Sequence, residues 1–212
     1  MQNAPIAIQN GFPMAEKISF TTQDGLTLKA MHYENEGKPA VVLLPMLGRT
    51  KDTWAPFAVE LQTNGFDVLA MDPWGHGESE GNLASFSEAD YNKMVLDLAA
   101  AQAFMNKSKI SFIGASIGAN NALKYASQNP AKVNAIVLLS PGLNYRGVDV
   151  SSVVFKGPML AAASSEDSYS FSSCKTIAEN NKAQFLQHSG LGHGTAMLSS
   201  KELRLAIIGF LG

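Results

Sequence analysis

The sequence predicts an α/β protein in which a mostly parallel central sheet carries helices on both faces. Residues 40–44 form a short, continuous apolar run, which is typical of a strand buried on both sides, and residues 110–113, apolar apart from Ser111, also indicate a short buried strand. Stretches with helical spacing separate such runs along most of the chain, as expected of parallel strands joined by helical crossovers. The residues that can carry chemistry follow predicted strands, so they should share one edge of the sheet.

The start of the chain should form a loop and then a hairpin. Residues 1–16 are expected to be a loop segment, and residues 17–212 are long enough for one domain with its own core. Residues 17–22 and 26–32 alternate between apolar and polar side chains around a turn at residues 23–25, which predicts an antiparallel pair of strands.

The rest of the chain alternates between predicted strands and helices. Strands are expected at residues 40–44, 67–71, 110–113, 133–140, 158–163 and 183–186. Helices are expected at residues 52–64, 87–105, 119–128, 173–180 and 199–211. Ser87 is expected to cap the second of these helices, and residues 199–202 form a capping-box pattern before the last. Residues 72–79 form a glycine-rich loop, and residues 141–156 an irregular connection.

The composition narrows the class of protein. Hydrophobic residues make up 46% and charged residues 16% of the chain, which suits a compact enzyme. A net charge of −2 without a basic block argues against nucleic-acid or anionic-membrane binding. The single cysteine, Cys174, excludes a disulfide framework and a cysteine zinc cluster, and neither a cofactor nor a metal is expected. No apolar run is long enough to span a membrane, and residues 1–15 lack a signal-peptide pattern. We therefore expect a soluble protein, with the cytoplasm favoured and an exported mature form left open.

The motif Gly-x-Ser-x-Gly at residues 114–118 lies between a predicted strand and a predicted helix. A turn this sharp strains the backbone of Ser116, and glycines at 114 and 118 avoid crowding between strand and helix. The helix start favours developing negative charge, so the Ile117 N–H is a natural oxyanion donor. An ordinary glycine-rich turn with an incidental serine is the alternative.

A serine nucleophile needs a neighbouring base. His193 is favoured, because Gly192 and Gly194 allow close backbone approach, and His188 in the same predicted loop is the alternative. His76 is expected to hold its own loop by hydrogen bonds.

The base in turn needs an acid that orients it. Asp167 follows the predicted strand 158–163 and gives the order Ser, Asp, His along the chain. Glu166 is the alternative, and either carboxylate could instead cap the next helix. Asp72 also ends a strand, but it is interpreted as an acceptor for loop amides.

The loop after residues 40–44 should supply the second oxyanion donor. Leu47 N–H is the expected donor, with Met46 as the alternative. Arg49 in the same loop could reach a substrate carboxylate, although a surface role is more common for such an arginine.

Taken together, these motifs resemble the α/β-hydrolase fold over about residues 18–211, and most of all its small, lid-poor esterase and dienelactone-hydrolase-like branch. The resemblance rests on the segments 72–79, 114–118, 164–167 and 192–194. It implies Ser116 as the nucleophile, His193 as the base and Asp167 as the acid, with backbone oxyanion donors at Leu47 and Ile117.

The chain departs from this family at three points. Pro45-Met46 stands where many members have His-Gly. Only residues 141–157 are available where many members insert a cap, so a substantial cap is not expected. The nucleophile position holds serine, whereas the dienelactone-type branch often uses cysteine.

The expected function is hydrolysis of small acyl esters through an acyl-enzyme, with a small-molecule acyl substrate as the partner. Thioester hydrolysis or acyl transfer would use the same groups. A non-catalytic binding protein on the same scaffold is the alternative of a different class. Removal of a halide is disfavoured, because that chemistry wants a carboxylate where Ser116 stands. The oligomeric state is not indicated by the sequence.

Overall fold

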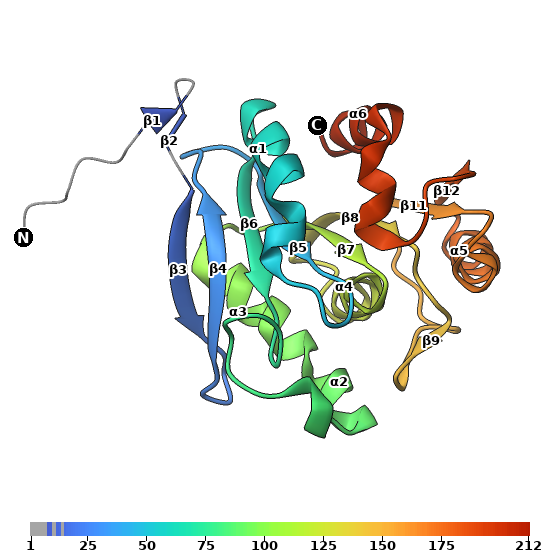
Figure 1. Ribbon diagram of the computed structural model, residues 1–212, viewed down its shortest axis with the longest axis horizontal. Helices are drawn as coiled ribbons and strands as arrows, with labels where there is room; N and C mark the ends of the chain where they lie inside the picture. Colours follow the sequence, from blue (N-terminus) through green and yellow to red (C-terminus); the bar gives the residue numbers. More distant parts are fainter. Residues whose placement is uncertain (1–7, 10–11, 14) are drawn as a thin grey trace, which may run out of the picture.

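The computed structural model describes residues 8–9, 12–13 and 15–212. Their centre is an eight-stranded sheet with the order β12-β11-β8-β7-β5-β6-β4-β3 (Figure 1). Its strands are β3 (Glu16–Thr21), β4 (Thr27–Tyr33), β5 (Ala40–Leu44), β6 (Asp67–Asp72), β7 (Ile110–Ala115), β8 (Val133–Leu139), β11 (Met159–Ser164) and β12 (Gln184–His188). The six strands from β12 to β6 are parallel, and the β3–β4 hairpin joins β6 antiparallel. The predicted mostly parallel sheet is therefore confirmed.

Helices cover both faces of this sheet. One face packs against α1 (Ala55–Thr63), the 3₁₀ helix η3 (Gly194–Ser199) and α6 (Lys201–Leu211). The other face packs against α3 (Val95–Met105), α4 (Ile117–Gln128) and α5 (Ser168–Asn181). Alternate residues of β5 divide between the two cores, with Val41 and Leu43 on the first face and Val42 and Leu44 on the second. This division explains why β5 reads as a continuous apolar run.

Several helices differ from their predicted bounds. The predicted helix 52–64 begins as the 3₁₀ helix η1 (Lys51–Trp54) before α1. The predicted helix 87–105 is divided at Met94 into α2 (Glu88–Lys93) and α3, and Ser87 caps α2 in a capping box with Asp90. α5 begins five residues earlier than predicted, because Asp167 caps it and its buried side chains pack on the sheet.

Two segments predicted to be irregular contain short strands. β1 (Ile8–Gln9) pairs antiparallel with β2 (Phe12–Pro13), where a loop was predicted. The remainder of residues 1–14 lies outside the described part of the chain. β9 (Asn144–Tyr145) pairs with β10 (Val148–Asp149) in the connection after β8, where a cap would be inserted. As expected, this connection forms no substantial cap. None of the described helices combines the length and apolar character needed to cross a membrane.

Candidate active site

The residues singled out from the sequence lie at the carboxyl ends of parallel strands. Leu47 follows β5, Asp72 ends β6, Ser116 follows β7, Asp167 follows β11, and His193 lies in the loop after β12. In an open parallel sheet this edge is where ligands bind.

Ser116 occupies a strained turn between β7 and α4. Its φ of 54° and ψ of −122° lie in a region that non-glycine residues rarely adopt. Its N–H donates to the Leu139 carbonyl at 2.9 Å, and its carbonyl accepts from Ala119 and Asn120 in the first turn of α4. The turn is therefore fixed by the sheet on one side and by the helix on the other.

The two glycines of the motif leave no room for a side chain. A Cβ at Gly114 would lie 2.4 Å from the Gly118 carbonyl oxygen, and a Cβ at Gly118 would lie 2.6 Å from the Pro45 carbonyl oxygen. Strand, helix and the loop after β5 can approach this closely only because both positions are glycine. The N–H groups of Ile117 and Gly118, the first two of α4, precede the first hydrogen bonds of this helix and have no acceptor among the described residues.

His193 and Asp167 form a close pair. His193 Nδ1 lies 2.5 Å from Asp167 Oδ2, and the His193 side chain is 39% exposed. The other carboxylate oxygen of Asp167 accepts from the Ser170 N–H at the start of α5, so Asp167 is also that helix's N-cap. Burial would raise the pKa of Asp167, but the hydrogen bonds from His193 and Ser170 outweigh it and hold the pKa below its ordinary value.

The loop that carries His193 lies directly beside the Ser116 turn. A Cβ at Gly194 would lie 3.4 Å from Ala115 Cβ. In the described part of the chain, His193 and Ser116 are not joined by a direct hydrogen bond. Catalytic hydrogen bonds of this kind are often long in an unliganded protein and tighten only when substrate is bound.

Two side chains, those of Glu166 and Ser140, hold the His193 loop by accepting hydrogen bonds from its backbone N–H groups. Glu166 accepts from the Gly192 N–H at 2.8 Å, from the Gly190 N–H at 2.9 Å and from the Ser164 hydroxyl at 2.7 Å. These bonds, the one from Gly192 first, lower the pKa of Glu166 to about 2. The buried Ser140 hydroxyl accepts from the Gly194 N–H at 2.9 Å. Glu166, the alternative acid, therefore binds loop amides, and its carboxylate makes no hydrogen bond to His193 among the described residues.

The loop after β5 meets both the Ser116 turn and the His193 loop. A Cβ at Gly194 would lie 2.2 Å from Met46 Sδ, so the methionine packs against the glycine backbone. Leu47 packs with Ile117, and the described residues offer no acceptor to its N–H. Arg49 is exposed and makes no ion pair with any described side chain.

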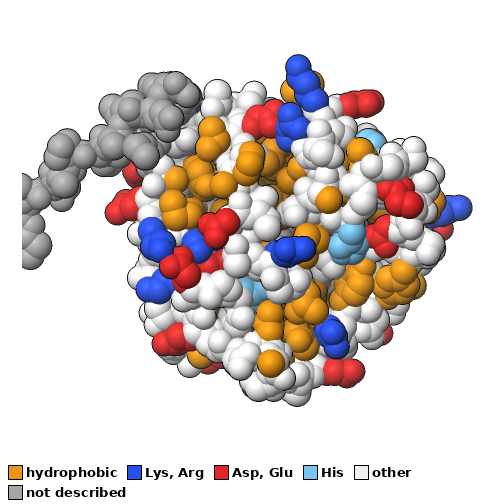
Figure 2. Space-filling model, viewed as in Figure 1, with side chains coloured by type: hydrophobic (Ala, Val, Ile, Leu, Met, Phe, Trp, Pro, Cys, Tyr) orange, Lys and Arg blue, Asp and Glu red, His pale blue; other side chains and the backbone are white. Residues whose placement is uncertain are grey.

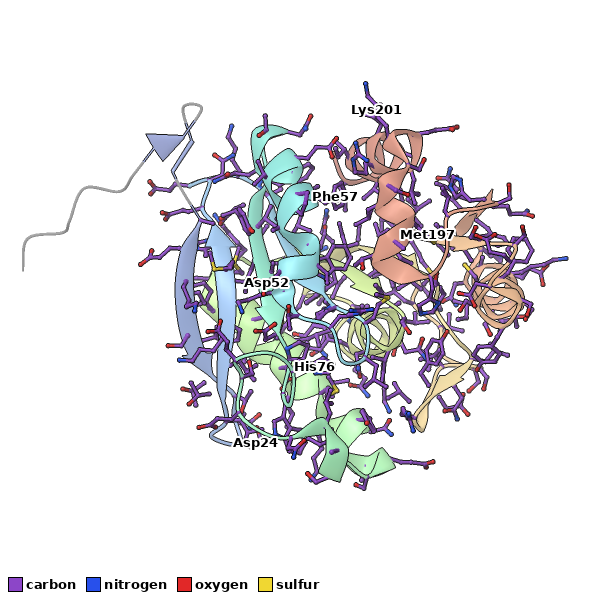
Figure 3. The ribbon with its side chains drawn as sticks, viewed as in Figure 1. Asp24, Asp52, Phe57, His76, Met197 and Lys201 are labelled. Atoms are coloured by element: carbon purple, nitrogen blue, oxygen red, sulfur yellow. The ribbon has the colours of Figure 1, made fainter. Side chains whose placement is uncertain are left out.

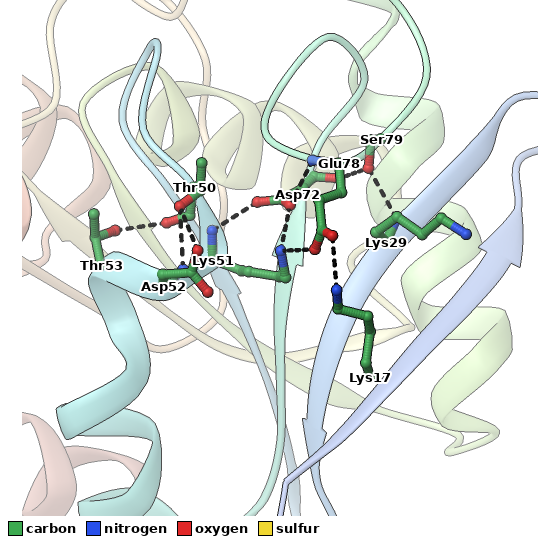
Figure 4. Close-up of polar contacts among 9 residues, drawn as sticks. All are labelled: Lys17, Lys29, Thr50, Lys51, Asp52, Thr53, Asp72, Glu78 and Ser79. Atoms are coloured by element: carbon green, nitrogen blue, oxygen red, sulfur yellow. Dashed lines mark hydrogen bonds and ion pairs between the residues drawn. The ribbon is translucent and has the colours of Figure 1, made fainter.

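Lys51 is a buried charged residue beside the site that the sequence did not reveal (Figure 4). Its N–H and its Nζ both bind the carboxylate of Asp72, at 2.7 and 2.8 Å, and Nζ also binds Glu78 at 2.7 Å. Burial favours the neutral amine, but the bonds to both carboxylates outweigh it and raise the pKa of Lys51. Asp72 also accepts from the Glu78 N–H, as predicted for an acceptor of loop amides. This cluster ties the Leu47 loop to the loop after β6.

His76 lies buried in the loop after β6 (Figure 3). Its Nδ1 binds the Trp74 carbonyl at 3.1 Å and its N–H donates to the Pro73 carbonyl, so it holds its own loop as predicted. Burial lowers the pKa of His76, which keeps the ring neutral. His188 ends β12, and its buried Nε2 has no partner among the described residues.

A buried carboxylate in α3, that of Asp97, binds the loop after β6 and should make the free energy of unfolding depend on pH. Asp97 is 1% exposed and accepts from the Trp74 N–H at 2.8 Å; burial raises the pKa of Asp97 to about 7. The folded protein therefore holds a proton that the unfolded chain releases near pH 4, so the free energy of unfolding should fall between about pH 4 and pH 7. In the wild type, the free energy of unfolding should fall by on the order of 4 kcal/mol over this range, and Asp97→Asn should abolish that fall. Urea unfolding at several pH values measures this slope.

The exposed Asp149 provides the control for this prediction. Its pKa is lowered by bonds from Ser151, so Asp149→Asn should leave the fall between pH 4 and pH 7 in place. An Asp97→Asn protein whose stability falls with pH as steeply as that of the wild type would contradict the assignment.

Tyr145 of the β9–β10 hairpin and Ser170 of α5 extend the site beyond what the sequence indicated. The Tyr145 hydroxyl lies 2.8 Å from Ser170 Oγ, and Ser170 Oγ lies 3.4 Å from His193 Nδ1. The rings of Tyr145 and His193 meet edge to face, with centroids 6.4 Å apart. Neither residue belongs to a local sequence motif. Both reach the site through contacts between distant segments, which the sequence alone does not indicate.

A groove of about 530 Å³ lies between α1 and the η3–α6 segment. It is lined in part by Thr53, Phe57, Ala196 and Leu198, and the Arg204–Glu60 ion pair also borders it. Neither Ser116 nor His193 lines it. On the face seen in Figure 2, acidic and basic side chains are interspersed, and no large area of a single sign is visible. Within the described residues, no group of three or more His, Cys, Asp or Glu is placed to hold a metal ion.

The sequence matches the α/β-hydrolase fold family over residues 39–187, and the chain belongs to that family. The resemblance inferred from the motifs is therefore confirmed at the level of the family.

Individual relatives extend the comparison. The acyltransferase drtE of Aspergillus calidoustus is 34% identical over 134 residues, which cover 59% of this chain and 42% of that protein. The serine hydrolase BPHL of Homo sapiens is 30% identical over 130 residues, which cover 60% of this chain and 44% of that protein. The chain thus spans less than half the length of these relatives. The esterase Pf2001 of Pyrococcus furiosus superposes with a TM-score of 0.78 at 18% identity, covering 99% of this chain and 98% of that one, which shows a shared fold.

Proposed function

We propose that the protein is a serine hydrolase that cleaves small acyl esters through an acyl-enzyme on Ser116. The observation that carries the proposal is the His193–Asp167 pair, held beside a serine in a strained strand–turn–helix at the same sheet edge. A serine hydroxyl needs such a base, and the base needs such a carboxylate. The serine-hydrolase and esterase names of similar proteins agree with this chemistry.

In the proposed reaction, Ser116 Oγ attacks the ester carbonyl while His193 Nε2 takes its proton. Asp167, on Nδ1, fixes the tautomer and stabilises the imidazolium. The negative charge that develops on the carbonyl oxygen is bound by the N–H groups of Ile117, at the start of α4, and Leu47. Each such donor is worth roughly 10²–10³ in rate in comparable sites. The alcohol then leaves, and water attacks the acyl-enzyme with His193 as base.

The substrate range follows from the architecture around the edge. With only the β9–β10 hairpin in the place of a cap, no large insertion covers the proposed site. An open site suits small esters or esters presented on a surface. It also admits an acceptor other than water, so acyl transfer is the second candidate, favoured by the match to an acyltransferase. A purely binding role fits less well, because candidates for the nucleophile, the base and the acid lie at the same edge of the sheet.

A fluorophosphonate probe tests the proposal and the choice of base together. The probe should label the wild-type protein at Ser116, as mapped by peptide mass spectrometry. His193→Ala should lower the labelling rate by at least about 10³-fold, because the serine loses its base. His188→Ala is the matched control and should label at the wild-type rate, since His188 lies within β12.

The opposite pattern would assign the base to His188. A wild-type protein that neither reacts with the probe nor hydrolyses p-nitrophenyl acetate would favour the binding role instead.

A further inference from the structure

The β9–β10 hairpin presents one side chain to the proposed reaction centre. Tyr145 stands at the end of β9, and the hairpin is braced by Tyr169, whose hydroxyl binds the Asn144 backbone at 2.9 and 3.1 Å. A Cβ at Gly142 would lie 2.7 Å from the Tyr145 ring, so the chain passes tightly beneath that ring. The position of Tyr145 is therefore defined by packing from both sides.

The Tyr145 hydroxyl faces the groups that handle protons in the proposed reaction. It lies 2.8 Å from Ser170 Oγ and 3.5 Å from the Ser140 carbonyl oxygen, and the nearby Ser116 hydroxyl acts to lower the pKa of Tyr145. The edge-to-face contact with His193 places the phenol beside the imidazole. Tyr145 is thus linked to His193 through Ser170 Oγ and through the contact between the two rings.

The protonation state of Tyr145 makes it a donor. Burial raises the pKa of Tyr145, and the nearby Asp167 carboxylate acts in the same direction, so the phenol keeps its proton at neutral pH. Ser170 Oγ can donate to the phenolic oxygen, and the phenolic proton then has the Ser140 carbonyl as its acceptor at 3.5 Å. This contact is long, so the proton can turn to a better-placed acceptor when substrate is bound.

We propose that Tyr145 is a further catalytic residue, whose hydroxyl donates a hydrogen bond to the leaving-group oxygen of the ester. This inference rests on the proposed function. When the tetrahedral intermediate collapses, the bond between its carbon and the leaving oxygen breaks, and the electron pair moves to that oxygen. The oxygen receives its proton from His193 Nε2, while Tyr145 keeps its own proton and stabilises the developing charge. Tyr145 flanks the His193 ring, and the leaving oxygen must approach that ring to receive its proton. The carbonyl oxygen is directed instead to the N–H groups of Ile117 and Leu47, so the leaving oxygen is the expected target of Tyr145.

A series of acetate esters with different leaving groups tests this role. p-Nitrophenoxide leaves readily without help, so Tyr145→Phe should lower kcat/KM for p-nitrophenyl acetate by a smaller factor than kcat/KM for alkyl acetates. Ethoxide is a strong base and needs the donor, so kcat/KM for ethyl acetate should fall roughly 10- to 100-fold, as expected for a hydrogen bond to a charged group. The dependence of rate on leaving-group basicity should therefore become steeper.

Tyr169→Phe is the matched control, because it removes a hydroxyl that braces the same hairpin and that, among the described residues, bonds only to the backbone of Asn144. Any loosening of the hairpin should slow all the esters by one common factor.

Two outcomes would overturn the inference. In the first, Tyr145→Phe slows every ester by the same factor, as expected for Tyr169→Phe, while the probe still labels Ser116. The Tyr145 hydroxyl then has only a structural role, and the proposed function stands. In the second, the wild-type protein lacks probe labelling and ester turnover, which removes the proposed function and this inference together.

Discussion

Replacement of Ser116 by alanine should lower kcat for ester hydrolysis by about 10⁶-fold, to a rate close to the background. In proteases with a comparable triad the three residues act as a unit, so loss of the nucleophile costs nearly as much as loss of all three. The Ser116 side chain is small and 7% exposed, and its turn is fixed by bonds to backbone atoms that alanine keeps. The measurement is steady-state turnover of p-nitrophenyl acetate together with fluorophosphonate labelling.

The unfolding temperature of the same protein supplies the control. Ser116→Ala should unfold within a few degrees of the wild type, so that lost activity cannot be ascribed to lost structure. Retention of more than about a hundredth of the wild-type kcat would show that another residue is the nucleophile.

Replacement of Asp167 by asparagine should lower kcat by about 10⁴-fold. An amide at this position no longer holds the proton on Nδ1 or stabilises the imidazolium, so the ring adopts the wrong tautomer. The loss should be greatest where His193 must act as a neutral base, and a profile of kcat/KM against pH would record it.

Glu166→Gln is the matched control, because Glu166 is adjacent, carries the same charge and was the alternative acid. It binds the amides of Gly190 and Gly192, and a glutamine oxygen can keep only part of these bonds. We expect a loss of about tenfold, through a looser His193 loop. A larger effect at Glu166 than at Asp167 would exchange their assignments.

The elements that sequence predicted well are those with local causes. The strand before Ser116 is apolar apart from Ser111, and Gly114 of the turn meets the backbone of Gly118, four residues further along the chain. The capping box at Ser87 is also encoded within four residues. Features of this kind can be predicted from sequence, because residues close to them in the chain supply the interactions that stabilise them.

The parts that sequence missed depend on contacts between distant segments. Lys51 would ordinarily be read as a surface lysine, yet β6 and the following loop enclose it with two carboxylates. Tyr145 reaches Ser170 across 25 residues, and the Ser140 hydroxyl reaches Gly194 across 54. The start of α5 has a serine-rich sequence with weak helix propensity, which the cap by Asp167 and packing on the sheet overcome.

The backbone strain at Ser116 limits how the protein can be engineered for robustness. A conformation of this kind costs roughly 1–3 kcal/mol in a residue with a side chain. Glycine at position 116 would relieve much of that energy, but it would also delete the hydroxyl. Heat tolerance and chemistry therefore compete at a single position, and a thermostable variant that stays active must draw its gains from elsewhere, such as the solvent-facing sides of α1 and α6.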